Sequence, residues 1–312
     1  MNELVDLPRK SQVNVAYLKD NEYSIQLMRW LLTSMGAWQS STATSATEKL
    51  RSIVLIIACF SLICLTFVPC TLYALLEEEN LQARMKALGQ VSYWVMGTIK
   101  YSYILFHRKN VRRCLDHIER DWFMVQRPKD RNIMLIYASN ARYFVFICMS
   151  FTFGGVLMYS LVKGMTPVPA FVDNHTVYLH PLPCPCYSKL VDTKFHPAYE
   201  IMYGVQFFSA LITSSIVVCA CSLAAIFVMH ACGQLAMMMA WMKDSFNETV
   251  DPADYELTDV VGLHVRVLSF IEYIENVINH ICLVELLGCT LNMCLLGYFC
   301  ITVRPRYSCD KL

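Results

Sequence analysis

Five apolar stretches of about twenty residues divide this chain, and they constrain its fold more than any other feature. A helix needs roughly 20 residues to cross the hydrocarbon core of a bilayer. The second stretch is the most polar, since it contains Gln90, Ser92 and Lys100. We therefore predict an all-α, multi-pass transmembrane helical bundle, with spans at residues 53–76, 88–106, 143–162, 201–229 and 281–303.

The composition agrees with a protein that lies in the lipid bilayer. Hydrophobic residues make up 56% of the chain and charged residues 16%. A net charge of +1 gives no sign of a nucleic-acid partner. The first twenty residues contain neither an apolar core nor a small-residue cleavage site, so we expect the first span to target the chain to the membrane.

The distribution of Lys and Arg predicts the orientation, because cytoplasmic loops are enriched in both. The link between the second and third spans is strongly basic, whereas the link between the third and fourth carries only Lys163, Lys189 and Lys194. This contrast favours a cytoplasmic N-terminus and an outer link before the fourth span. The triplet "NHT" in that link makes Asn174 a predicted glycosylation site. A second triplet, "NET" at 247–249, falls on the predicted inner side and should stay unmodified.

Two charged residues inside the predicted spans need an explanation. Lys100 lies near the inner end of its span, so we expect its ammonium to reach the interface along the aliphatic side chain; a buried position facing other helices is the alternative. Glu285 has two interpretations. It either reaches interfacial water in the same way or remains a neutral, hydrogen-bonded carboxyl within the bundle.

The segment before the fifth span predicts an amphipathic helix that continues into the membrane. Its apolar positions can share one helical face while Glu272 and Glu275 point away. The positions expected on that face are Val261, His264, Val265, Leu268, Ile271 and Ile274.

Several stretches, taken in order, resemble insect odorant receptors. "FHRKNVRRCLDHIERDW" is similar to the linker after the second helix of that family, and "HPAYEIMYGVQ" to the start of its fourth helix. "LHVRVLSFIEYIENVINHICLVELLGCTLNMCLLGYFCI" resembles its fifth helix, and "LMRWLLTSMGAW" its short membrane-surface helix before the first span. The resemblance covers residues from about 23 to 302 and is carried by the order and spacing of loose motifs.

The resemblance implies a seven-span receptor domain with a cytoplasmic N-terminal segment (residues 1–50) in the plasma membrane of sensory neurons. It implies a ligand-gated cation channel, in which a tuning subunit and a shared co-receptor subunit form a hetero-oligomer, expected to be a tetramer. The family's seventh helix lines the pore. Since "TVRPRYSCDKL" resembles neither the sixth nor the seventh helix, we expect a C-terminally truncated chain that cannot form the pore alone.

The resemblance also implies a pocket for small volatile odorants in the outer half of the bundle, among the second, third, fourth and sixth helices. Aromatic, Met and Gly residues at that depth would give an adaptable apolar wall. Ordinary helix packing is the alternative explanation for each of them. The candidate ligand-binding residues are Tyr93, Trp94, Gly97, Gly154, Met158, Tyr203, Gln206 and Phe207.

The remaining motifs predict no catalytic residues, no cofactor and no metal site, so we do not expect an enzyme. Cys184 and Cys186 precede the fourth span, but their irregular spacing from nearby histidines does not favour a metal. They are too close in sequence to bridge each other, so one either pairs with another outer Cys or stabilises a lid. A gustatory receptor of the same superfamily is the near alternative, and a multi-pass transporter or enzyme, with charged residues converging at mid-membrane, is the distant one.

Overall fold

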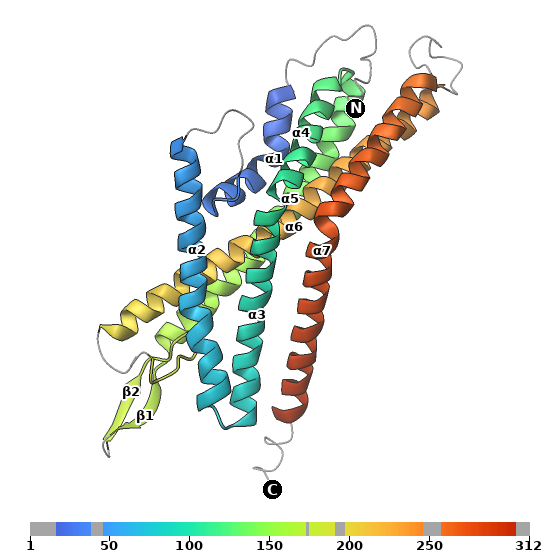
Figure 1. Cartoon of the computed structure of the whole chain (residues 1–312). Coiled ribbons are helices and arrows are strands. Elements are labelled where there is room, and N and C mark those ends of the chain that lie inside the picture. Colours follow the sequence, from blue (N-terminus) through green and yellow to red (C-terminus); the bar gives the residue numbers. More distant parts are fainter. Residues whose placement is uncertain (1–16, 39–45, 173–174, 191–196, 246–256, 304–312) are drawn as a thin grey trace. The chain divides into compact units, whose positions relative to one another are not determined.

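The computed structural model describes residues 17–38, 46–172, 175–190, 197–245 and 257–303, and within these it is mostly helical (Figure 1). Its helices are α1 (Tyr17–Ser34), α2 (Ala46–Leu72), α3 (Leu81–Phe106), α4 (Arg108–Met124), α5 (Pro128–Met165), α6 (Ala198–Ser245) and α7 (Leu257–Val303), and a π-helical turn, η1 (Tyr73–Glu77), extends α2. The strands β1 (Val168–Val172) and β2 (His175–Leu179) form an antiparallel hairpin. The predicted all-α class is confirmed, and the hairpin is a local feature of the link before α6.

All five predicted spans lie inside helices that continue beyond the apolar stretch. By length and composition, four of the described helices can cross a membrane: Ala46–Glu77, Pro128–Met165, Ala198–Asp244 and Thr258–Thr302. The segment predicted at 88–106 is helical within α3 but more polar than these four. A continuous helix from the charged segment through the last apolar stretch is confirmed by α7.

The chain divides into two compact units. Unit 1 comprises Met1–Trp30, His107–Phe146 and Cys221–Asn279, and unit 2 comprises Leu31–Phe106, Ile147–Ala220 and His280–Leu312. Each unit is assembled from three segments that are far apart in the sequence. The boundaries between the units fall within α1, α5, α6 and α7, so these helices contribute residues to both.

The core of unit 1 is built around α4, whose sequence is strongly amphipathic. Val111, Cys114, Leu115, Ile118 and Trp122 are buried at helical spacing, so one face of α4 packs inward while its basic residues lie on the other faces. Large buried side chains from the other helices of unit 1 complete this core: Met28, Met134, Phe227 and Phe270.

The apolar face expected for the first half of α7 is not the face that is buried, although Glu272 and Glu275 are exposed as predicted. Val261, Val265, Leu268 and Ile271 are exposed, and of the predicted set only Ile274 is buried. The inward face instead consists of a second apolar row, Val267, Phe270, Ile274 and Val277. Both rows satisfy helical periodicity, so the pattern alone could not distinguish them.

In unit 2, the end of α1 requires a glycine. Gly36 has φ of +70°, and the Ala37 N–H donates to Leu32 O at 2.8 Å, which together close the helix with a left-handed residue. A Cβ at Gly36 would lie 2.6 Å from the Ser52 carbonyl oxygen. The "Gly-x-Trp" ending therefore turns the chain where α2 packs closely against it.

Pro69 lies inside α2 of unit 2, as the sequence indicates. Proline removes one backbone donor and disfavours regular helix on its N-terminal side. The helix nevertheless continues to Leu72 and is extended by the η1 π-turn, which ends when the Glu78 N–H donates to Tyr73 O at 3.1 Å. The carbonyl of Pro69 accepts from the Tyr187 N–H at 3.2 Å, which attaches the loop before α6 to α2.

Candidate functional site

In unit 2, α3 and α6 bring together several of the residues predicted to bind a ligand. The Tyr93 hydroxyl lies 3.0 Å from the Ser214 hydroxyl, within hydrogen-bonding distance. Trp94 is 3% exposed, and its ring centroid lies 5.7 Å from that of Tyr93 in an edge-on arrangement. Tyr93 therefore lies at the contact between α3 and α6, with the buried Trp94 ring beside it.

Gly97 allows a close approach of these two helices. A Cβ at this position would lie 2.5 Å from Thr213 Cγ2, so no larger residue fits without movement. Thr213 is fully buried, and its hydroxyl has no hydrogen-bond partner among the described residues. A buried hydroxyl without a partner costs about 1–3 kcal/mol. Thr213 and Ser214 are not among the residues predicted from the sequence, although the triplet "TSS" at 213–215 interrupts an apolar helix and marks them.

The Gln206 side chain is already occupied by the loop before α6. Its Oε1 accepts from the Cys184 N–H and its Nε2 donates to Cys184 O, both at 2.9 Å. Nε2 also lies 3.6 Å from Cys186 Sγ. With 1% of its surface exposed, Gln206 holds the loop on α6 and has little capacity left for a ligand.

A second polar cluster fastens the same loop from α3 and α5. Pro183 O accepts from Gln90 Nε2 at 3.0 Å and from the Tyr159 hydroxyl at 2.9 Å. Pro183 and Cys184 therefore form hydrogen bonds with α3, α5 and α6. These bonds fix the loop before α6 on the helices of unit 2.

The other predicted ligand residues are dispersed. The Tyr203 hydroxyl donates to Ser160 O at 2.7 Å, so it joins α6 to α5. A Cβ added at Gly154 would meet no atom within 4 Å, and Met158 is 63% exposed, so neither is packed against another described residue in the manner of Gly97. Phe207 is half-buried and its ring contacts Phe208. Asn174 lies outside the described residues.

A polar seam joins α3 to α7 in unit 2. Ser92 donates to Asn292 Oδ1 at 3.2 Å, Tyr103 stacks on His280 with ring centroids 5.3 Å apart, and Lys100 forms an ion pair with Glu285 between them. Lys100 is 4% exposed, so the predicted extension toward the interface is wrong. Glu285 is an ion-pair partner, which neither interpretation from the sequence included.

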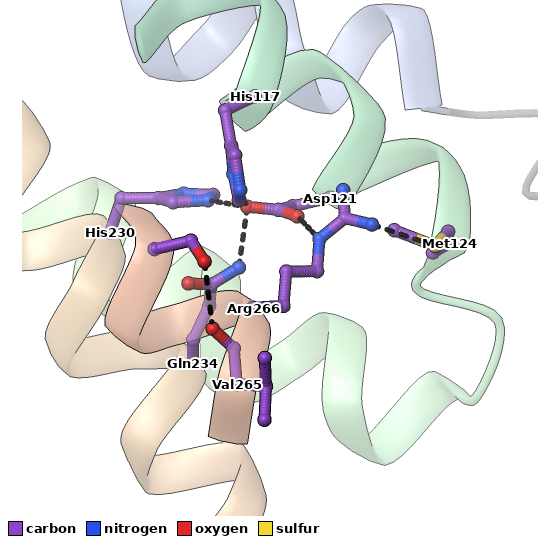
Figure 2. Close-up of polar contacts among 8 residues, drawn as sticks. His117, Asp121, Met124, His230, Gln234, Val265 and Arg266 are labelled. Carbon is purple, nitrogen blue, oxygen red and sulfur yellow. Dashed lines mark hydrogen bonds and ion pairs between the residues drawn. The ribbon is translucent and has the colours of Figure 1, made fainter. Parts of the chain in front are cut away.

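In unit 1, a buried carboxylate collects donors from three helices (Figure 2). Asp121 Oδ2 accepts from His117 Nδ1 at 3.0 Å, from His230 Nε2 at 2.9 Å and from Gln234 Nε2 at 2.5 Å, and Oδ1 accepts from Arg266 Nε at 2.5 Å. We call these five residues the Asp121 cluster. Sequence reasoning missed it, because its members are separated by up to 149 positions and form no local motif.

The electrostatics of the Asp121 cluster keep the carboxylate ionised. Burial alone would raise the pKa of Asp121, but hydrogen bonds from His117 and His230, and the charges of His230 and Arg266, outweigh burial and lower the pKa well below its usual range. An ionised Asp121 accepts from all four donors at once, so it joins α4, α6 and α7 within unit 1.

Three comparisons relate the chain to known proteins. Residues 80–308 match a family model described as "7tm Odorant receptor". The solved structure of the olfactory receptor OR5 from the insect Machilis hrabei is similar, with a TM-score of 0.65 and 16% identity over 91% of this chain and 72% of that one. The same receptor in complex with eugenol gives a TM-score of 0.66 and 15% identity over the same shares. A search of curated proteins found no match.

Proposed function

Because the chain belongs to the insect odorant receptor family, we propose that it binds small volatile odorants and gates a cation channel together with a shared co-receptor subunit. It is a multi-pass membrane protein of a family of receptors and channels rather than enzymes. The Machilis hrabei receptor forms a complex with eugenol, a small volatile phenol, and we assign ligands of that general size and chemistry to this chain.

One observation carries the ligand-binding part of the proposal: the unpartnered hydroxyl of Thr213 beside Gly97. This hydroxyl lies in an apolar helix contact next to the Tyr93–Ser214 hydrogen bond. An apolar volatile with one polar atom would satisfy the hydroxyl and contact Trp94 and Tyr93. Such a ligand of about ten heavy atoms, at about 0.5 kcal/mol per atom, would bind with a dissociation constant of about 100 μM.

Gating requires the ligand to favour one arrangement of the helices, because equal affinity for two states shifts neither. The contact of α3 with α6 is suited to this role. At Gly97 there is no side chain to keep the helices apart, so a ligand entering there has to separate them. We expect the open arrangement to be the one in which Thr213 and Gly97 lie farther apart.

The orientation proposed from the charge pattern has a cytoplasmic N-terminus. The basic helix α4 then lies in the cytoplasm, and the loop with Pro183 and Cys184 lies on the outer side, over the odorant site. We propose the plasma membrane of sensory neurons as the location of the protein. Asn174 is proposed to carry a glycan. Antibody access to a tag at Met1 in intact and permeabilised cells tests the orientation, because access in intact cells would contradict it.

Assembly with the co-receptor, as a proposed heterotetramer, requires surfaces outside the bundle. The described part of α2 offers one, since Ile53, Val54, Ile57 and Leu65 are exposed. Lipid and a neighbouring subunit are both suitable partners for such a face. Co-purification of the two subunits in mild detergent tests this part of the proposal.

The decisive experiment compares Thr213→Val with Thr213→Ser in cells that co-express the co-receptor subunit. Odorant-evoked current is recorded for volatiles with and without a hydrogen-bonding group. Val keeps the shape but removes the hydroxyl, so half-maximal concentrations should rise about tenfold for polar volatiles and stay unchanged for hydrocarbons. Ser215→Ala is the matched control, because the Ser215 hydroxyl is bonded to Leu211 O of its own helix. Equal losses for both ligand classes would place the ligand elsewhere.

A further inference from the structure

Three cysteines of unit 2 come together where α2 meets the loop before α6. Cys70 lies in α2 and is fully buried, and Cys184 of the loop is 7% exposed. Cys186 follows two residues later and is half-buried. In this chain most other cysteines lie along apolar helices, so a group of three near one loop requires its own explanation.

The backbone around these cysteines is fixed from two sides. The Tyr187 N–H donates to Pro69 O at 3.2 Å, which holds the loop against the residue that precedes Cys70. The paired hydrogen bonds of Gln206 hold both backbone polar groups of Cys184 at 2.9 Å. The loop is therefore ordered at the positions that set the distance between Cys70 and Cys184.

In the structure both thiols are free, and they lie within hydrogen-bonding reach of each other. The Cys70 thiol donates a hydrogen bond to the Cys184 sulfur, and this bond lowers the pKa of Cys184 although burial opposes the change. The Trp94 indole N–H donates to the same sulfur and acts in the same direction. A thiol with a lowered pKa is the better nucleophile for disulfide exchange near neutral pH.

We propose that Cys70 and Cys184 form a disulfide bond in the mature protein. The inference rests on the orientation proposed above, which puts both residues in the oxidising compartment. The Cys184 thiolate attacks a protein disulfide of the secretory pathway and releases one of its thiols. The Cys70 thiolate then attacks the Cys184 sulfur and releases the second. Two protons and two electrons leave the cysteine pair, and the oxidant is reduced to a dithiol.

Cys186 is the residue left unpaired. The Cys184 sulfur accepts its thiol hydrogen bond from Cys70, and the thiol of Cys186 is raised in pKa to about 11 by burial, followed by the neighbouring Cys184. Its sulfur lies 3.6 Å from Gln206 Nε2. A bridge between Cys184 and Cys186 would close a ring with only Pro185 between them, which strains disulfide geometry.

The Cys70–Cys184 disulfide would fasten the loop that contains Pro183 and Cys184 over the proposed ligand site. It joins α2 to the loop that Gln206, Gln90 and Tyr159 hold on the other helices of unit 2. It also fixes the sulfur that accepts from Trp94, one of the candidate ligand residues. Forming or breaking the bond should therefore alter the ligand response without any substitution in the ligand site.

The test is peptide mapping of the full chain expressed in insect cells and purified without reductant. Free thiols are alkylated with N-ethylmaleimide under denaturing conditions before digestion. We expect a cross-linked peptide pair whose fragment ions assign Cys70 and Cys184, with Cys186 alkylated. Alkylation of both Cys70 and Cys184, or a link from Cys70 to Cys186, overturns the proposal.

Two controls separate this test from the proposed orientation and function. The glycan at Asn174 is measured by glycosidase treatment of the same sample. A glycosylated chain with free Cys70 and Cys184 refutes the disulfide and leaves the orientation intact. In a second arm, dithiothreitol should lower the melting temperature of the wild type and of Cys59→Ala by several degrees, but not that of Cys70→Ser. An equal effect of dithiothreitol on Cys70→Ser also overturns the proposal.

Discussion

The ammonium of Lys100 on α3 pairs with the carboxylate of Glu285 on α7. The two side chains differ in environment, because 5% of the Lys100 side chain and 38% of the Glu285 side chain is exposed. The pair lies in the middle of the α3–α7 seam, between Ser92–Asn292 and Tyr103–His280. It therefore neutralises two charges that would each be costly in a bilayer.

Removing one partner of this pair should destabilise unit 2 asymmetrically. Glu285→Gln leaves the more deeply buried charge unpaired and should cost about 3 kcal/mol, while Lys100→Met should cost less because Glu285 retains partial exposure. The double variant should recover most of the loss, as a double-mutant cycle of melting temperatures will show. Additive effects of the two substitutions would contradict a direct pair.

Gly97→Ala should be destabilising by about 1–3 kcal/mol, because the added methyl would lie 2.5 Å from Thr213 Cγ2. Adding Thr213→Ser, which removes that methyl, should restore most of the melting temperature. Gly155→Ala is the control, since its Cβ would meet no atom within 4 Å. A helical alanine is favoured over glycine by about 0.5–1 kcal/mol, so the control should be neutral or stabilising. Equal destabilisation by both alanine variants would argue against the close approach of α3 and α6.

Asp121 should stabilise unit 1 down to low pH. Its folded-state pKa lies below the ordinary value of 3.8, so its contribution is complete above that value and is lost as the pH falls through the folded pKa. The free energy of unfolding carried by Asp121 should therefore be constant between pH 7 and pH 5. Asp121→Ala should cost about 3 kcal/mol at pH 7, because it leaves the Arg266 guanidinium without its carboxylate.

Melting temperatures of the wild type and of Asp121→Asn across this pH range measure the effect. The difference between the two proteins should be flat from pH 7 to pH 5 and shrink only in stronger acid. A difference that disappears already between pH 6 and pH 5 would show that the folded-state pKa of the carboxylate is raised rather than lowered, and would contradict the prediction.

Gln206→Met should release the loop that contains Cys184, while the methionine side chain still fills the space that the glutamine occupies. Two backbone groups of Cys184 lose their partners, at a cost of about 1–3 kcal/mol. Hydrogen exchange should accelerate at residues 183–190 and stay unchanged in the Asp121 cluster. Tyr203→Phe is a suitable comparison, since it removes one hydrogen bond to Ser160 O and leaves the loop contacts in place. Unchanged exchange at 183–190 would refute the assigned role of Gln206.

The sequence predicts what depends on local pattern and fails where distant residues meet. The helical class, the helices at the five apolar stretches and the continuous α7 follow from hydropathy and periodicity. The partner of Lys100 could not be found in this way, because Glu285 is separated from it by 185 positions and no local pattern joins them. The buried face of α7 had two equally apolar solutions, and only the tertiary packing of Phe270 against Phe227 within unit 1 decides between them.

For the candidate ligand site too, local pattern predicted some residues correctly and could not reveal contacts with distant parts of the chain. Depth and residue type identified Tyr93 and Gly97, which do lie at the contact with α6, and Trp94, whose ring packs edge-on against Tyr93. They could not show that Gln206 is occupied by a loop backbone, or that Met158 is exposed, because both depend on where the chain returns after the third span. Whether these residues bind the odorant stays a prediction.

The four hydrogen bonds to Asp121 fix the register of α4, α6 and α7 relative to one another within unit 1. A helix rises about 1.5 Å per residue, so sliding α6 or α7 by a single step relative to α4 would carry His230, Gln234 or Arg266 out of range. Motions that shear these three helices past one another are thereby penalised, while rotation of unit 1 as a block is not. Any conformational signal that passes through this part of the receptor should therefore travel as rigid-body movement.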